Sequence, residues 1–350
     1  MSTTASFSQP GADNVLRTRC CCMAALIFAL IACLGWALSI GLPEVGLSCA
    51  GNYLFGGPVS AEVSRIFHDV RLPRVLMAVL AGAGLSLSGA GTQAVLCNPL
   101  VSPSILGLAS GASFGAGLMI LYGNRWFPFF GQPVLIGAAF LMAMVAVTLS
   151  YTLASLRRSS RETVILAGIA VGFIFSGGTV FLHYMATFQD LRAIIFWSVG
   201  SLWSADMASV LILVPIVAAG FLILTGCSAR LNTLVLGEES AAGLGVNVKL
   251  LRLFTLTLCA FICASVVAFN GAIGFVGLIA PHIARTMFGL DNRWLLPGSA
   301  LAGALLLLFA DSLARTFMWP QELPVGVTTS LVGGPFFLFL LLRRKKDWWS

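Results

Sequence analysis

Charged side chains are scarce in this sequence: they make up 9% of the residues, whereas 58% are hydrophobic. A soluble globular domain carries about 25% charged residues. The mean hydropathy of +0.96 would leave large apolar patches uncovered in water, and soluble monomers rarely expose such patches. The shortage of charge therefore excludes an ordinary soluble domain and indicates a chain whose solvent is a lipid bilayer.

Ionisable groups are nearly absent from the apolar runs themselves. Between residues 75 and 155 the only charge is Arg125, in an expected loop. Ion-driven carriers need carboxylates or histidines inside the membrane to bind or relay their ions, although such residues are costly there. Their scarcity argues against a proton- or sodium-driven carrier, and no charged ring or filter motif indicates an ion channel.

The sequence also lacks a phosphate-binding loop. Its three lysines are Lys249, Lys345 and Lys346, and none completes a GxxxxGK[ST] pattern. We therefore expect no catalytic residue here and no cofactor in this chain, so active transport would need ATP and Mg in a partner ATPase. The nine cysteines form no CxxC pair, so we expect no metal site. No basic stripe with interleaved aromatics points to nucleic acid.

Ten apolar runs alternate with short polar connections. A spanning helix needs about 20 apolar residues, so the runs predict an all-α polytopic membrane protein with about ten transmembrane helices. The eighth run is too short to cross alone, and Gly271, Gly274 and Gly277 predict a broken or partly re-entrant element there. The runs lie at 22–41, 73–96, 104–122, 133–155, 163–185, 207–227, 250–269, 275–286, 294–314 and 325–342.

The distribution of cations predicts the orientation. With a cytoplasmic N-terminus, six of the twenty Lys and Arg residues fall outside and the other fourteen inside, which is the bias of the positive-inside rule. We therefore expect a multi-pass protein of the cell inner membrane with both termini cytoplasmic. The expected parts are an N-terminal segment at 1–21, a transmembrane permease domain at 22–343 and a C-terminal tail at 344–350.

Several motifs follow one another in a specific order. RLPR opens the second run (71–74), NPL-x-x-P-x-x-LG follows at 98–107, and LGEESAAGLGV stands at 236–246. A Pro-His pair at 281–282, an Asp311-x-x-x-Arg315 pair and an ELPVG turn at 322–326 come later. In this order, from about residue 70 to 350, the chain resembles the FecCD-family permeases, the membrane subunits of type II ABC importers for ferric siderophores, haem and vitamin B12.

The resemblance implies partners and functional residues. A second permease copy, identical or paralogous, would form the dimer, with two ATP-binding subunits below and a periplasmic or lipid-anchored substrate-binding protein above, all at a lipid membrane. The cytoplasmic coupling helices would lie at about 229–248; on pattern alone this segment is equally an amphipathic surface helix pair. The ATPase-coupling residues carried over are Leu236, Gly237, Glu238, Glu239, Ser240, Ala241, Leu244 and Gly245.

Two further sets of residues carry over from the family. Asn98 and Leu100 match the inner-gate turn and Gly172 the interface helix; the alternative is that they only form a turn and pack. Arg71, Arg74 and Arg315 match the positions that dock the binding protein. The alternative for the arginines is that Arg315 pairs with Asp311 one helical turn away, while Arg71 and Arg74 sit at the lipid headgroups.

The expected function is import of a substrate through the membrane, driven by ATP hydrolysis in partner subunits. A ferric siderophore is the commonest cargo of the family, and haem, cobalamin and molybdate remain alternatives, because the sequence does not separate them. A more remote alternative is a secondary carrier or exporter of hydrophobic compounds.

Overall fold

The computed structural model describes residues 12–40, 51–52, 57, 60–127, 131–156, 161–317 and 321–342. All regular secondary structure in these ranges is helical. The sequence predictions for residues 1–11 and 343–350 lie outside the described ranges. Within them, α1 begins at Ala12, about ten residues before the first apolar run.

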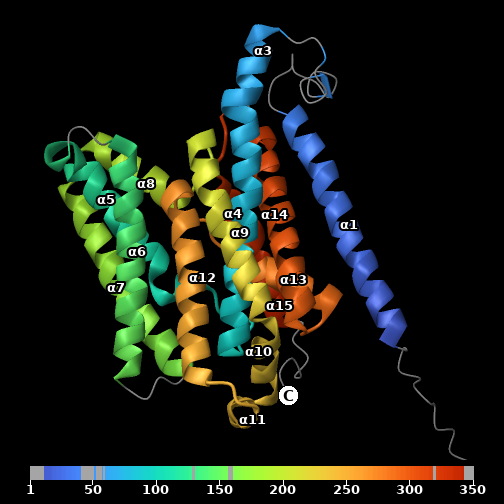
Figure 1. Cartoon of the computed structure of the whole chain (residues 1–350). Coiled ribbons are helices and arrows are strands. Elements are labelled where there is room, and N and C mark those ends of the chain that lie inside the picture. The colour runs from blue at the N-terminus through green and yellow to red at the C-terminus, as the bar shows by residue number, and fades with distance from the viewer. Residues whose placement is uncertain are drawn as a thin grey trace, which may run out of the picture.

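The helices form one bundle (Figure 1). Their bounds are α1 Ala12–Ser39, α3 Ala61–Arg65, η1 (a π-helix) Ile66–Arg71, α4 Leu72–Leu96, η2 (3-10) Pro103–Leu106, α5 Leu108–Trp126, α6 Gly131–Ser155, α7 Arg161–Met185, α8 Phe188–Val199, α9 Met207–Gly226, α10 Ser228–Thr233, η3 (3-10) Leu234–Leu236, α11 Glu238–Gly243, α12 Val248–Asn270, α13 Val276–Phe288, α14 Asn292–Phe317 and α15 Val325–Leu342.

Each of the ten predicted apolar runs corresponds to one of these helices: α1, α4, α5, α6, α7, α9, α12, α13, α14 and α15. Among the described residues, seven helices are long and apolar enough to cross a membrane, and α5 and α15 contribute shorter apolar stretches. The eighth, α13, has 13 residues and is about 20 Å long, against roughly 30 Å of hydrocarbon. The predicted polytopic helical fold and its short eighth element are confirmed.

The chain leaves helical structure between α12 and α13. Gly271 takes a φ of +71° and stops α12. Residues 271–274 run without helical structure, and Phe275 is the N-cap of α13. This stretch is buried against the end of α8, because a Cβ at Gly271 would lie 2.1 Å from the Trp197 carbonyl oxygen. Non-helical backbone at membrane depth is tolerated where protein or a cavity covers it, which explains the predicted break.

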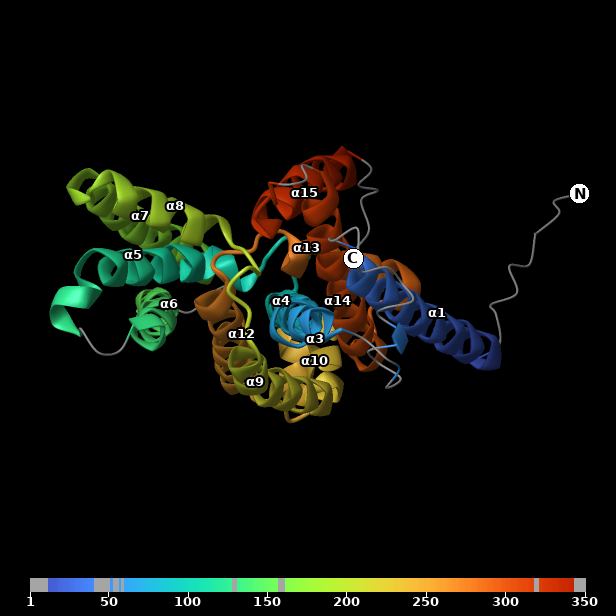
Figure 2. The ribbon, with the colours of Figure 1, turned by 90° about the horizontal axis from the view of Figure 1, so that it is seen from above.

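Helix α4 lies at the centre of the bundle, among α9, α12, α13 and α14 (Figure 2). It packs most closely against α14. A Cβ at Gly82 would lie 2.2 Å from the Gly303 carbonyl oxygen, and the Ser86 hydroxyl donates to the Ser299 carbonyl at 2.5 Å. Close backbone approach of this kind is the main way in which helices associate in lipid, so α4 and α14 form one tightly packed pair.

One feature of the fold was not predicted. Helix α4 is continued backwards by η1 and α3, so that helical structure runs from Ala61 to Leu96 and α3 projects above the bundle (Figure 1). The added residues include Glu62, Arg65 and Asp69, whose polarity sets them apart from the apolar run that follows. Capping by Ser60, whose hydroxyl accepts from the Val63 amide, begins the helix there.

Candidate functional site

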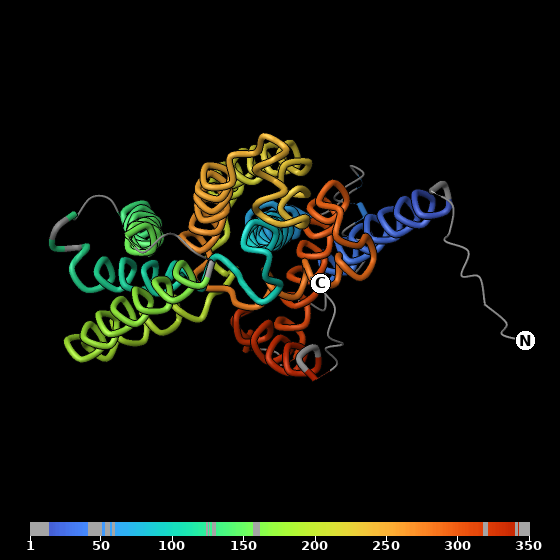
Figure 3. The backbone as a smooth tube through the Cα atoms, turned by 90° about the horizontal axis from the view of Figure 1, so that it is seen from below, coloured from blue at the N-terminus to red at the C-terminus, as the bar shows by residue number. Residues whose placement is uncertain are grey.

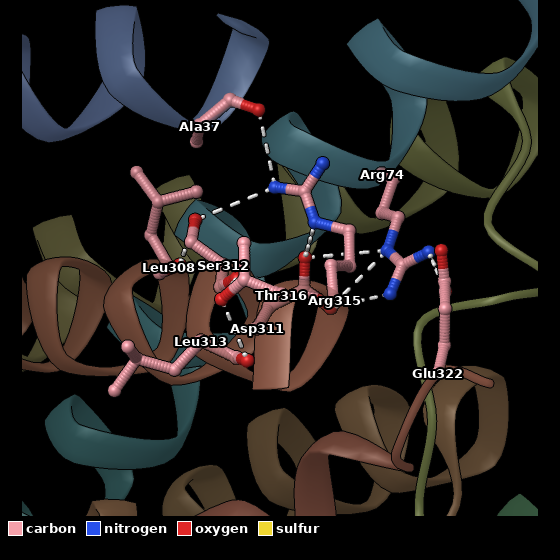
Figure 4. Close-up of polar contacts among 9 residues, drawn as sticks. All are labelled: Ala37, Arg74, Leu308, Asp311, Ser312, Leu313, Arg315, Thr316 and Glu322. Carbon is pink, nitrogen blue, oxygen red and sulfur yellow. Dashed lines mark hydrogen bonds and ion pairs between the residues drawn. The ribbon is translucent and has the colours of Figure 1, made fainter. Parts of the chain in front are cut away.

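Figure 4 shows a cluster of charged residues, which lies where α4 begins and α14 ends. The Arg74 guanidinium from α4 donates to both carboxylate oxygens of Asp311 from α14, at 2.9 to 3.2 Å. Its Nη1 donates to Glu322 at 2.6 Å. Asp311 is fully buried and also pairs with Arg315 at 3.2 Å, one helical turn away. Two cations therefore share one buried carboxylate, with a second carboxylate at the edge.

Arg71 and Arg315 also contact the C-terminal end of α1. Arg71 Nη1 donates to the Leu38 carbonyl oxygen, and Arg315 Nη2 donates to the Ala37 carbonyl oxygen at 3.2 Å. The last carbonyls of a helix have no partner within it, and cations stabilise this negative end. Arg71 and Arg315 are thus C-terminal caps of α1. The cluster is defined here as Arg71, Arg74, Asp311, Arg315 and Glu322.

The structure brings together the three arginines that the sequence placed in one docking site. All three are buried, with at most 8% of each exposed, so Arg71 and Arg74 do not lie among lipid headgroups. The alternative pairing of Arg315 with Asp311 is present. Docking of a binding protein to these residues stays a prediction. The cluster does hold three guanidinium groups against two carboxylates, and Nη2 of Arg71 is buried without a hydrogen-bond acceptor.

The predicted coupling residues lie at the opposite end of the bundle, in what we call the α10–α11 segment (residues 228–245). Figure 3 views the bundle from this end, where the segment lies beside α4, α12 and α14. Its inner face is apolar, and Leu231, Leu234 and Ala241 are buried. Its outer face exposes Leu236 and Leu244, at 66% and 63%. Gly237 takes a φ of +100°, which allows the sharp turn into α11.

The two glutamates of the segment differ. Glu239 is exposed, as the sequence predicted. Glu238, although partly exposed, pairs with Arg252 in the first turns of α12 at 2.6 Å, and Arg252 itself is buried. Replacing Glu238 would therefore also remove an ion-pair partner of a buried cation.

The predicted gate residues lie in a compact turn after α4. Cys97 ends α4 in the left-handed conformation, and the Asn98 side chain accepts from the Leu100 amide at 3.0 Å. The Cys97 thiol also lies 3.6 Å from the Leu234 carbonyl oxygen, so this turn touches the α10–α11 segment. Gly172 lies elsewhere, across from Gly107, where a Cβ on Gly107 would come 3.0 Å from the Gly172 nitrogen. The structure leaves the gating roles of Asn98, Leu100 and Gly172 as predictions.

A cavity of about 560 Å³ opens between η2, the end of α8 and the start of α15. Sequence patterns do not predict this cavity, because its wall combines η2, α5, the ends of α8 and α12, and α15. The wall carries the hydroxyls of Ser104, Ser198 and Ser330 and no ionisable side chain. Among the described residues, no group of three His, Cys, Asp or Glu side chains is placed to hold a metal ion.

Two polar contacts of these sites were missed by sequence reasoning. Glu322 lies in the ELPVG turn, which was read only as a turn, yet it binds Arg74 across 248 residues. Asn232 lies before the recognised coupling motif and bonds to Asp291 and Asn292. Neither contact leaves a periodic signal in the sequence, because both join segments that are distant in the chain.

Comparisons with known proteins agree with these features. The model of the FecCD transport family matches residues 26–343. The chain is 39% identical to the hemin transport system permease protein HmuU of Yersinia pestis, over 89% of this chain and 93% of that protein. It is 38% identical to the Fe(3+)-citrate import system permease protein YfmE of Bacillus subtilis, over 91% and 94%.

A solved structure also matches nearly the whole chain. It is described as an inward-facing conformation of a metal-chelate type ABC transporter, with a TM-score of 0.81 and 31% identity. The match covers 92% of this chain and 99% of the other. The bundle described above is therefore the fold of an ABC importer permease.

Proposed function

Because the chain belongs to the FecCD transport family, we propose that it is the membrane permease of a binding-protein-dependent ABC importer for a ferric chelate. ATP and Mg would bind in two partner ATPases, and the chain itself would carry no catalytic residue. A second permease copy would complete the translocation pathway. The protein would cross the inner membrane several times with both termini in the cytoplasm.

The observation that carries this proposal is the exposed apolar face of the α10–α11 segment. Leu236 and Leu244 are exposed in a segment that lies beyond the ends of the spanning helices α9 and α12. Lipid does not cover such a position, and apolar side chains that stand out into water mark protein interfaces. An ATPase docked at the cytoplasmic face would cover them. A secondary carrier would have no need of this surface.

For the cargo, we favour a ferric siderophore, with haem, cobalamin and molybdate as alternatives. The cavity wall offers hydroxyl groups and no ionisable side chain. A wall of this kind suits a chelate whose metal is already enclosed by its own ligands, whereas a bare metal ion would need carboxylate, imidazole or thiolate ligands. Relatives named for haem and for ferric citrate are almost equally similar to this chain, so similarity alone does not choose between them.

Transport assays test the proposal directly. Proteoliposomes that contain this chain, its ATPase and its binding protein should accumulate a ferric chelate only when ATP is supplied. Parallel assays with a ferric siderophore, haem and cobalamin identify the cargo. Accumulation without the ATPase, driven by an ion gradient, would contradict the proposal and favour the secondary carrier.

We further propose that the arginine cluster receives the binding protein. The cluster holds three guanidinium groups against two carboxylates, and this excess of one cation favours an acidic partner, since a guanidinium can hold a carboxylate in a bidentate, oriented contact. Since Arg74 and Arg315 are already paired with Asp311, reversing their charge would disturb the bundle as well as docking. Arg71 is therefore the residue to change.

Changing Arg71 to lysine should weaken binding-protein affinity about tenfold, which is roughly 1.4 kcal/mol. Lysine keeps the charge and can still cap α1 through a single bond, but it cannot bind a carboxylate in bidentate fashion. Titration of the purified complex with binding protein at rising salt measures the effect. Arg125→Lys, at an exposed arginine on α5, is the matched control. An affinity indifferent to Arg71→Lys and to salt would exclude the docking role.

A further inference from the structure

Polar side chains link the α10–α11 segment to the bundle at several points, and one of these links leads to α14. The Asn232 side-chain amide donates to Asp291 Oδ1 at 2.7 Å. Its carbonyl oxygen accepts from both the backbone and the side-chain nitrogen of Asn292, each at 2.9 Å. All three bonds go to two consecutive residues at the start of α14, and Asn292 is buried.

Asp291 is the centre of this link. Its Oδ1 also accepts from the Arg293 amide at 3.1 Å, so the carboxylate caps the first turn of α14. Its Oδ2 lies 3.6 Å from Nη1 of Arg19 on α1. One carboxylate therefore joins the start of α14 to α10 on one side and to α1 on the other. A different link, Glu238 with Arg252, leads to α12 instead.

Helix α14 connects this link to the arginine cluster. It has 26 residues and is about 39 Å long, with Asn292 at one end and Asp311 and Arg315 near the other. It cannot slide along α4, because Gly82 meets Gly303 and Ser86 bonds to Ser299. Packed rigid elements of this kind carry coupling between distant sites.

We propose that Asn232 and Asp291 are positioning residues that make the ATPase respond to the binding protein. A binding protein that engages the arginine cluster shifts the α4–α14 pair, and the Asn232–Asp291 link moves the α10–α11 segment with it. The inference rests on the proposed function, since it needs an ATPase at the segment and a binding protein at the cluster. Breaking the Asn232–Asp291 link should uncouple ATP hydrolysis from binding-protein docking. The arginine cluster and the exposed face of the α10–α11 segment would both stay in place.

The test compares ATP hydrolysis by the full complex with and without saturating binding protein. Asn232→Asp places two carboxylates face to face at the 2.7 Å contact, and like charges at this distance repel. We expect the stimulation factor, the ratio of the two rates, to fall toward one. The double variant Asn232→Asp with Asp291→Asn exchanges donor and acceptor and keeps a capping side chain on α14, so we expect it to recover at least half of the stimulation.

Arg19→Gln is the matched control, because it removes another partner of Asp291 and leaves the bond to Asn232 intact; its stimulation factor should stay within twofold of the original. Three results would overturn the inference: unchanged stimulation in Asn232→Asp, no recovery in the double variant, or a proportional fall of both rates that leaves their ratio unchanged. The last of these would indicate a purely structural role. A starting complex that shows no stimulation at all would instead count against the proposed function.

Discussion

Changing Asp311 to asparagine is expected to remove about 3 to 5 kcal/mol of folding free energy, the usual cost of breaking a buried ion pair. Asp311 is fully buried and pairs with two arginines. The amide keeps the size of the side chain but leaves Arg315 without a counter-ion inside the bundle. We expect the variant to unfold at a much lower temperature than the original protein. Purified protein is heated to a series of temperatures, and size exclusion measures the fraction that stays folded at each.

Two further variants test whether the lost stability comes from the unpaired charge of Arg315 rather than from the change of side chain. In Asp311→Asn with Arg315→Gln, Arg74 keeps Glu322 as its partner and the cluster loses one charge of each sign, so part of the stability should return. Asp206→Asn is the control, because asparagine caps α9 as well as the native aspartate does and should be neutral. A double variant no more stable than Asp311→Asn alone would contradict the ion-pair explanation.

The second large effect is expected at the α10–α11 segment. Changing Leu236 to aspartate should abolish co-purification of the ATPase and lower ATP-driven uptake by more than tenfold. A central apolar residue of an interface contributes about 2 kcal/mol or more, which corresponds to roughly a 30-fold loss of affinity. The side chain is 66% exposed, so the permease should still fold and insert normally.

Glu239→Lys should act in the same direction, because it reverses a charge on the same exposed surface. It is a cleaner change than one at Glu238, which would also disturb the buried Arg252. Glu62→Lys makes the same substitution on the exposed α3, at the other end of the molecule, and should leave ATPase binding intact. If the ATPase still co-purifies with the Leu236→Asp and Glu239→Lys variants, the segment is only a surface helix pair.

Hydropathy alone predicted most of the fold, because lipid imposes a simple rule: each spanning segment must be apolar and must satisfy its own backbone bonds. The short α13 followed from the same rule, since Gly271 and Gly274 interrupt the run. The helical extension through Glu62 and Asp69 could not be predicted in this way. It lies beyond the long apolar run, where polarity no longer distinguishes helix from loop.

The candidate site was predicted as a set of positions but not as a set of contacts. Motifs brought Arg71, Arg74 and Arg315 together as one group, and the structure places them in one cluster. That Arg74 binds Asp311 and Glu322, across 237 and 248 residues, follows only from the packing of α4 against α14. For the same reason the link between Asn232 and Asp291 was missed, because neither side chain is unusual in its own segment.

The two arginines that cap α1 are synthesised at very different times. Arg71 follows Leu38 by 33 residues, so the first cap is synthesised soon after α1 itself. Arg315 follows Ala37 by 278 residues, and at about 5 to 20 residues per second the ribosome needs roughly 14 to 56 s to reach it. During most of translation, at most one of the two arginines is therefore available to cap α1, and the second becomes available only when α14 is nearly complete.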